Sequence, residues 1–364
     1  MKTQNTRRAL VAGMAVFAAT LMAGVGMTRA ADQLKVGFVY VSPVGDAGWT
    51  YQHDLARKAI EEKYGDKIKT TFVESVPEGA DAERVIRQLA ADGNSLIFTT
   101  SFGYMNPTIK VAKRFPKVTF AHCSGYKRSK NVSTYLARFY EGRYLAGVTA
   151  GKMTKSNTVG YVAAFPIPEV VRGINAFARG LRSVNPKAEV RVVWVSSWYD
   201  PGKEREAAET LMAQGADVLM QHTDSTAVVQ AAQDRGKFAV GYHSDMSKYG
   251  PKAHLTASTH NWTKFYIEKV DAVIAGKAES GDTWGGIGDG MVEMSPFGDM
   301  VPEDVRNLVN GARDKIAGGA LHPFAGPVKD NTGKVRVAEG ATITDKELLT
   351  MDYFVEGVQG EVPK

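Results

Sequence analysis

Cysteine is almost absent from this sequence of 364 residues, in which Cys123 is the single example. A lone cysteine excludes an internal disulfide and every cysteine-pair motif. It also lies far from the N-terminus, so no lipid-bearing cysteine follows the first segment of the chain. We interpret Cys123 as a packing residue, because the sequence assigns no base that would activate its thiol.

Long apolar runs are also absent, apart from residues 9–27. A basic stretch over residues 2–8 precedes that run, and Thr28-Arg29-Ala30 follows it with small residues at the positions of a cleavage site. The run is long enough to span a membrane, but it is rich in Ala and Gly rather than Leu and Ile. We therefore favour a cleaved signal peptide over residues 1–31 rather than a membrane anchor. Export without a lipid anchor or a disulfide predicts a soluble protein of the bacterial periplasm.

A strong excess of charge of one sign is missing from the rest of the chain. The formal net charge is +6, but four basic residues and no acidic residue precede Asp32. Removal of the signal peptide lowers the net charge to +2. A net charge this small does not indicate the basic surface that binding to nucleic acid needs. We expect no nucleic-acid partner.

Catalytic and cofactor motifs are missing too. Four histidines (53, 122, 222 and 243) are scattered, and no H-x-x-x-H, C-x-x-C or G-x-S-x-G arrangement occurs. The glycine-dense segment 281–290 looks loop-like, lacks the Lys-Ser/Thr of a phosphate-binding loop and follows no strong strand. The sequence predicts no metal site and no cofactor.

What is present is an alternation of short apolar runs and amphipathic stretches. Apolar strands separated by helices predict parallel sheets covered on both faces. The predicted strands are 35–41, 70–75, 95–100, 118–122 and 132–136, then 158–164, 190–195, 217–221, 238–241 and 254–259. The predicted helices are 48–64, one from Asp81, one from Pro168, one from Pro201, 261–275 and 303–317. We favour an α/β fold with two Rossmann-like lobes joined by a hinge.

The pattern restarts near Thr158, which suggests how the chain divides. We expect chain crossings near Arg138, Ser258 and Asp282, with 254–275 returning to the first lobe. The expected parts are a first lobe of 32–138 and 258–282, a second lobe of 139–257 and 283–325, and an irregular tail of 326–364 with one short strand at 334–337.

Polar and aromatic residues gather after the predicted strands, where open α/β sheets bind ligands. Three tryptophans (49, 198 and 284), together with Phe102 and Tyr104, suit a flat ligand, because aromatic side chains stack on planar rings. A plainer interpretation is that the acidic residues cap helices. We favour the cap for Asp81, whereas for Asp46 the sequence supports a cap and a binding role equally. The candidate binding residues are Asp46, Trp49, Gln52, Phe102, Gly103, Tyr104, Ile167, Glu169, Trp198, His222, Thr223, Asp224, Tyr242, Asp245 and Trp284.

Three segments resemble the basic membrane protein family of ABC-transporter substrate-binding proteins. They are Asp46-Ala-Gly-Trp-Thr-Tyr-Gln52, the segment 167–177 that begins Ile-Pro-Glu, and Val240-Gly-Tyr-His-Ser-Asp245. The family commonly has Asp-x-x-Phe-Asn-Gln at the first and Gly-x-Asp-x-Asp at the third. The resemblance covers about the whole chain after the signal peptide. It implies a type I periplasmic binding protein that delivers a purine base or nucleoside to an ABC permease.

Carried over to this chain, the resemblance places Asp46, Trp49 and Gln52 on the first-lobe side of a cleft. It makes Phe102 a stacking face and places Asp245 on the second-lobe side. His243 replaces the first Asp of the third segment, and Trp198 and His222 add bulk. This departure favours a free purine base, such as adenine, hypoxanthine or guanine, over a nucleoside.

Other functions remain open at this point. A nucleoside remains the second candidate ligand, and a monomer is the expected state. A nucleoside-processing enzyme that uses Asp46 and His243 is a further alternative, and so is a sensor partner of a membrane receptor.

Overall fold

The computed structural model describes residues 33–364. The predicted signal peptide lies outside these residues. Within 33–364, no helix is both long and apolar enough to cross a membrane.

Six parallel strands form the first sheet, in the order β2-β1-β3-β4-β5-β11. The strand β11 lies inside the glycine-dense segment that the sequence suggested as a loop. It escapes sequence analysis because it has four residues, one of them glycine, and no apolar alternation. The strands of this sheet are Leu34–Val39 (β1), Ile68–Val73 (β2), Leu96–Thr99 (β3), Thr119–Cys123 (β4), Val132–Ala137 (β5) and Asp282–Gly285 (β11).

The second sheet also has six strands, in the order β7-β6-β8-β9-β10-β12. Five of them are parallel, and β12 pairs antiparallel with β10 at one edge. The strands are Thr158–Ala163 (β6), Glu189–Trp194 (β7), Val218–His222 (β8), Phe238–His243 (β9), His254–His260 (β10) and Val292–Met294 (β12). The two sheets confirm the predicted fold class.

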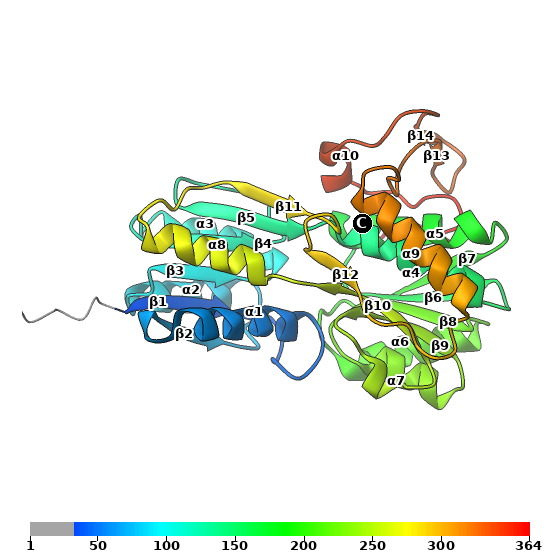
Figure 1. Cartoon of the computed structure of the whole chain (residues 1–364), viewed down its shortest axis with the longest axis horizontal. Coiled ribbons are helices and arrows are strands. Elements are labelled where there is room, and N and C mark those ends of the chain that lie inside the picture. Colours follow the sequence, from blue (N-terminus) through cyan, green and yellow to red (C-terminus); the bar gives the residue numbers. More distant parts are fainter. Residues whose placement is uncertain (1–32) are drawn as a thin grey trace, which may run out of the picture. The chain divides into compact units, whose positions relative to one another are not determined.

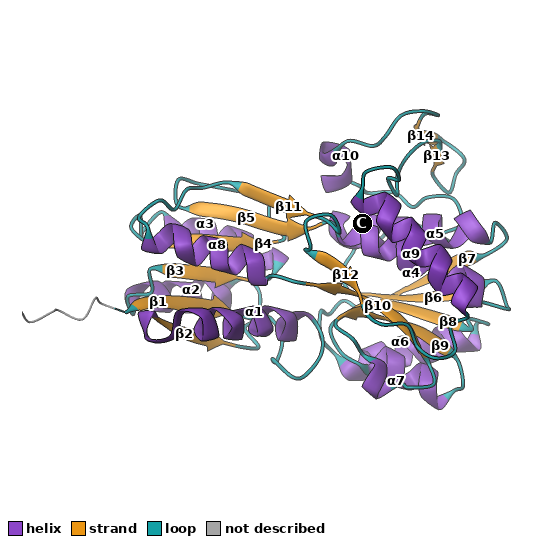
Figure 2. Cartoon of the chain, viewed as in Figure 1, coloured by secondary structure: helices purple, strands orange, loops and turns teal. Residues whose placement is uncertain are grey.

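Helices cover both faces of each sheet (Figures 1 and 2). In the first lobe α1 packs beside α8 on one face, and α2 packs beside α3 on the other. In the second lobe α4, α5 and α9 cover one face, and α6 and α7 cover the other. The bounds are Trp49–Tyr64 (α1), Ala80–Ala91 (α2), Met105–Ala112 (α3), Phe139–Met153 (α4), Pro168–Val184 (α5), Pro201–Ala213 (α6), Ala227–Asp234 (α7), Thr263–Ile274 (α8) and Glu303–Ala317 (α9).

The expected cap at Asp81 is wrong. The helix α2 begins one residue earlier, after Gly79, and no side-chain hydrogen bond caps it. Asp81 lies in the first turn instead, where its carboxylate contacts Arg84 at 3.2 Å. A carboxylate in the first turn is still favourable, because it faces the positive end of the helix dipole.

The chain passes between the two sheets three times: after β5, between β10 and α8, and between β11 and β12. Ser258 lies within a strand of the second sheet, and Asp282 begins a strand of the first. The second and third passages therefore lie a few residues further along the chain than Ser258 and Asp282. Of the segment 254–275, only the helix α8 returns to the first lobe, where it packs on α1. The strand β10 stays in the second sheet, because it pairs with β9. The full division of residues between lobes stays a prediction.

The tail after residue 325 packs on the second lobe (Figure 1). Its strands Val328–Lys329 (β13) and Val335–Val337 (β14) form an antiparallel pair. A short helix, Asp345–Leu349 (α10), begins with a capping box between Thr344 and Glu347. Leu348 and Phe354 reach the second-lobe core, so the tail is part of that core rather than an appendage.

Candidate ligand-binding site

A pocket of about 330 Å³, its open mouth included, lies where the carboxyl ends of the two sheets face each other. Its walls come from the ends of β1, β3 and β4 in the first lobe and of β6, β7, β8 and β9 in the second. The lining residues are Val41, Trp49, Ser101, Phe102, Ser124, Ile167, Glu169, Trp198, His222, Asp224 and His243. Seven of these were predicted from the sequence.

Aromatic side chains form the broad walls of the pocket. The indole of Trp49 is fixed by a hydrogen bond from Nε1 to the carbonyl of Thr100, at 2.6 Å. Its ring meets the His243 ring edge-on, with centroids 5.3 Å apart. On the second-lobe side, Trp198 packs edge-on against Phe165 at 5.0 Å. Rings held in fixed orientations provide flat contact surfaces for a planar ligand.

Glu169 and His222 form one polar edge. Glu169 is at the start of α5, and His222 ends β8; both are buried. His222 Nε2 lies 3.8 Å from Glu169 Oε1, which is too far for a hydrogen bond. Burial raises the pKa of the Glu169 carboxyl, although the charge of Arg172 opposes that shift. Burial lowers the pKa of His222 well below its usual range, so its imidazole is neutral at pH 7.

Asp224 and His243 form a second polar edge. His243 Nε2 lies 3.2 Å from Asp224 Oδ1, and its Nδ1 is hydrogen bonded to His260 Nε2 at 3.0 Å. Burial lowers the pKa of His243 and raises that of Asp224, each well away from its usual value. The two histidines that line the pocket are therefore neutral, and each ring carries one N–H donor and one acceptor nitrogen.

Several contacts join the two lobes around the pocket. The amide of Gly48 donates to Ser244 Oγ at 2.6 Å, and Ser42 Oγ donates to Asp224 Oδ2 at 3.4 Å. Trp198 Nε1 donates to Glu78 Oε1 of the first lobe at 3.3 Å. The structure thus describes the closed arrangement of the lobes.

Asp46 lies at the rim rather than in the pocket. It follows β1 and is exposed, and Lys248 Nζ of the second lobe contacts its carboxylate at 2.6 Å. The hydroxyl of Tyr249 donates to the same carboxylate. These hydrogen bonds, that of Lys248 first, lower the pKa of Asp46. Asp46 therefore bridges the lobes and does not line the pocket.

Seven other predicted residues also lie outside the pocket lining. Gln52 and Asp245 line a separate groove beside the hinge, with His260 and Trp262. Tyr104 and Tyr242 belong to the hydrophobic cores, and Thr223 is buried. The amide of Gly103 donates to Glu78 at 2.8 Å.

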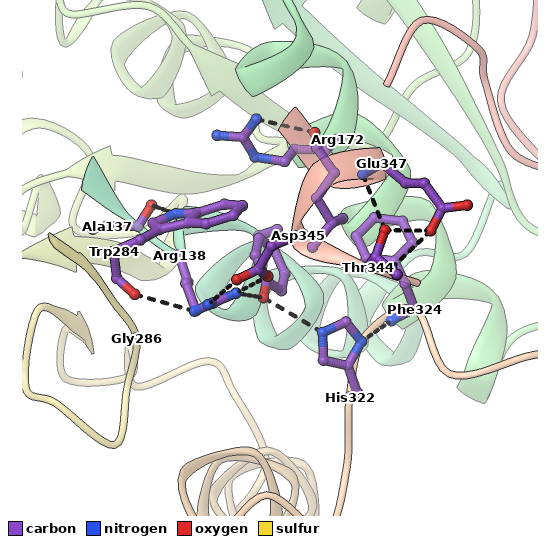
Figure 3. A network of polar contacts seen from close by, with 12 residues as sticks. Ala137, Arg138, Arg172, Trp284, Gly286, His322, Phe324, Thr344, Asp345 and Glu347 are labelled. Carbon is purple, nitrogen blue, oxygen red and sulfur yellow. Dashed lines mark hydrogen bonds and ion pairs between the residues drawn. The ribbon is translucent and has the colours of Figure 1, made fainter. Parts of the chain in front are cut away.

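Trp284 lies near a chain crossing (Figure 3). Its Nε1 donates to the carbonyl of Ala137 at 3.1 Å, and the guanidinium groups of Arg138 and Arg172 lie over its ring. Arg138 also makes two hydrogen bonds to Asp345 of α10, at 2.7 and 2.8 Å. Trp284 thus supports the region of the hinge and does not contact the ligand pocket.

The candidate binding residues did not include Val41, Ser101, Ser124 or His243; His243 was given only as a departure from the family pattern and as part of the enzyme alternative. Each of them ends a parallel strand or lies within two residues after one, and that position is the one signal that would have found them. Glu78 was also missed: it accepts hydrogen bonds from Ser101 and Gly103 and carries no local motif. Within residues 33–364, no group of three or more His, Cys, Asp or Glu side chains is placed to hold a metal ion.

The model of the Bmp family, described as ABC transporter substrate-binding protein PnrA-like, matches residues 33–319. The chain belongs to this family. Its resemblance to the family, stated from three segments, is confirmed. As a Bmp member the chain is a substrate-binding protein of an ABC transporter and not an enzyme. The alternative of a nucleoside-processing enzyme is therefore excluded.

Two named relatives cover nearly the same length. A purine-binding protein of Brucella abortus (strain 2308) is 51% identical over 339 residues, covering 93% of this chain and 97% of that protein. A Haloferax volcanii protein, provisionally named an ABC transporter glucose-binding protein, is 40% identical over 333 residues, covering 91% and 82%.

Solved structures support the same fold for this Bmp protein. A transcriptional activator of the comK gene from Bacillus halodurans matches with a TM-score of 0.67 at 26% identity, covering 80% of this chain and 100% of that one. A solute-binding protein from Aeropyrum pernix K1 matches with a TM-score of 0.69 at 20% identity, covering 86% and 97%. At that identity the second match shows the fold alone.

Proposed function

We propose that this protein captures a purine base between its lobes and delivers it to an ABC permease. One observation carries the proposal: the pocket pairs flat aromatic walls with polar groups at its edges. Stacking of a base on an aromatic side chain contributes about 1–3 kcal/mol, and edge hydrogen bonds then fix its orientation. The name of the Brucella abortus relative points to the same ligand class.

A purine suits the pocket better than a sugar does. The walls at Trp49, Phe102 and Trp198 present three aromatic side chains to the ligand. A heteroaromatic base can use both its faces against them, whereas a sugar is not planar. The donors and acceptors at the two polar edges match ring nitrogens and exocyclic groups.

Binding measurements with purified protein test this proposal. The protein is unfolded, dialysed and refolded to remove any co-purified ligand, and its melting temperature is followed with bases, nucleosides, sugars and amino acids. A ligand at one hundred times its Kd stabilises the folded state by about 2.7 kcal/mol. We expect stabilisation by adenine, hypoxanthine or guanine. Stabilisation by nucleosides alone supports the nucleoside alternative, and stabilisation by glucose or amino acids alone refutes the purine proposal.

We also propose that residues 1–31 direct export to the periplasm, where a monomer meets its permease. Expression of the full-length chain in a Gram-negative host, followed by fractionation and N-terminal sequencing, tests this proposal. We expect a monomer in the periplasmic fraction, with the N-terminus of the mature protein within a residue or so of position 31. Full-length protein in the membrane fraction would contradict it.

A further inference from the structure

Arg143 is a buried charge that lies outside the lining of the pocket. It lies on α4 and is 0% exposed. Within residues 33–364, none of its three guanidinium nitrogens has a hydrogen-bond partner. The positive charge of the guanidinium therefore acts on whatever lies near it.

His222, which lines the pocket, lies close to Arg143. The Arg143 guanidinium carbon lies 3.1 Å from the ring centroid of Tyr242, and the His222 ring lies 4.8 Å from the same ring. A methyl group added at Gly173 would meet Arg143 Nε at 3.6 Å and His222 Nδ1 at 3.7 Å. The Arg143 guanidinium and His222 Nδ1 therefore lie around the same point beside Gly173, and Nδ1 has no hydrogen-bond partner among residues 33–364, while His222 lines the pocket.

This placement affects the proton of the His222 ring. The neutral imidazole carries one N–H, on either Nδ1 or Nε2. The charge of Arg143 disfavours the protonated ring, in addition to the larger effect of burial. By the same electrostatics, a positive charge on the Gly173 side, where Nδ1 lies, favours the lone pair at Nδ1 and the hydrogen at Nε2.

We propose that Arg143 is a positioning residue that holds His222 as its Nε2–H tautomer, so that the pocket presents a fixed donor beside the Glu169 acceptor. His222 and Glu169 together then recognise a ligand edge on which a hydrogen-bond acceptor lies next to an N–H group. The amidine edge of adenine and the lactam edge of hypoxanthine or guanine both have this pattern, whereas a purine methylated at those atoms lacks it. The ligand class rests on the proposed function above; the tautomer does not.

Nitrogen-15 NMR of the ligand-free wild-type protein measures the tautomer directly. His222→Gln assigns the ring signals of residue 222. We expect a neutral ring with its hydrogen on Nε2, and a mixed or Nδ1–H ring in Arg143→Met. A wild-type His222 that is charged or carries its hydrogen on Nδ1 overturns the inference, even if the variant fails to fold.

Binding measurements separate positioning from a merely structural role. In Arg143→Met the affinity for the identified base should fall about tenfold, the cost of one misdirected hydrogen bond. His222→Gln places an amide nitrogen near the former Nε2 without a tautomer, so adding Arg143→Met to it should change affinity by less than about twofold. An equal loss in both backgrounds overturns the inference. If the wild type binds no purine, the proposed function fails while the NMR result still decides the role of Arg143.

Discussion

Phe102 illustrates how one side chain tests the pocket. It follows β3 in a short turn, is half-buried and lines the pocket. Loss of one stacking face costs about 1–3 kcal/mol, so Phe102→Ala should weaken purine binding about 5- to 150-fold. Calorimetric titration measures the change. Phe72→Ala, on the exposed side of the edge strand β2, is the matched control and should bind as the parent does. Equal affinity in the two variants would remove Phe102 from the site.

Asp46 leads to the opposite expectation. The sequence treats it as a ligand acceptor, but the structure places it at the rim in an exposed pair with Lys248. Exposed ion pairs contribute little, so Asp46→Asn should weaken ligand binding by at most about fivefold, and less in high salt. Titrations at low and high ionic strength check this. A loss of tenfold or more at both salt concentrations would instead support a direct contact with the ligand.

The predicted residues that line the pocket share a position rather than a motif. Trp198 and His222 follow or end apolar strands, and the carboxyl ends of parallel strands meet at one edge. Asp46 and Asp245 have the same signal, but their loops extend past the pocket to the rim and the hinge groove. Local spacing does not encode how far a loop reaches, which is set by packing between the lobes.

At the scale of elements, the helix α4 shows why some structure was missed. Phe139–Met153 is buried on nearly every side, so its apolar residues show no helical periodicity that would reveal one exposed face. It packs closely on α5: a methyl group at Gly147 would lie 2.0 Å from the carbonyl oxygen of Phe177. The strands were easier to predict, because buried parallel strands read as continuous apolar runs.

This close approach gives a stability prediction. Gly147→Ala forces α4 away from α5 and should lower the free energy of unfolding by at least about 2 kcal/mol, as overpacked cores do. Gly311→Ala, in the middle of α9 with open space around it, should raise that free energy by about 0.5–1 kcal/mol through helix propensity. Denaturant titration of both variants checks the pair, and a neutral Gly147→Ala would contradict the packing described.

At the scale of the whole molecule, Gly48 is a point of close approach between the lobes. Its φ is +97°, and an added methyl group would lie 2.1 Å from the carbonyl oxygen of Asp224 in the other lobe. Gly48→Ala should therefore hinder closure and weaken ligand binding by about a hundredfold or more, since closure buries the ligand. Gly45→Ala is the control: its φ is also positive, but its nearest neighbour is Ala47 of the same loop, at 3.9 Å. Equal affinities in the two variants would show that closure does not depend on this contact.

Histidine burial makes stability depend on pH. All seven histidines of the chain are in its described part, and burial lowers the pKa of each, to about 3 for His122 and about 4 for His254. Below about pH 6.5 the unfolded chain binds protons at these rings while the folded protein does not, so stability falls as the pH falls. Four carboxyl groups with pKa values raised by burial partly offset this: Glu141, Glu169, Glu204 and Asp224.

Between pH 7 and pH 5, the loss of stability caused by the seven histidines exceeds the gain from the four carboxyl groups. We expect the melting temperature to drop by at least about 5 °C from pH 7 to pH 5, since each extra proton bound by the unfolded state costs about 1.4 kcal/mol per pH unit. Differential scanning calorimetry at constant ionic strength measures it. A constant or higher melting temperature at pH 5 would contradict the burial of these rings.

The single cysteine has a practical consequence for watching the lobes move. Cys123 ends β4 in the first-lobe core, and burial raises the pKa of its thiol well above the usual value. A thiol that is buried and protonated does not react with maleimide dyes. A cysteine introduced by Tyr199→Cys, at an exposed position next to Trp198, would then be the one labelled site. A fluorophore there turns the protein into an optical sensor whose brightness reports ligand capture in real time.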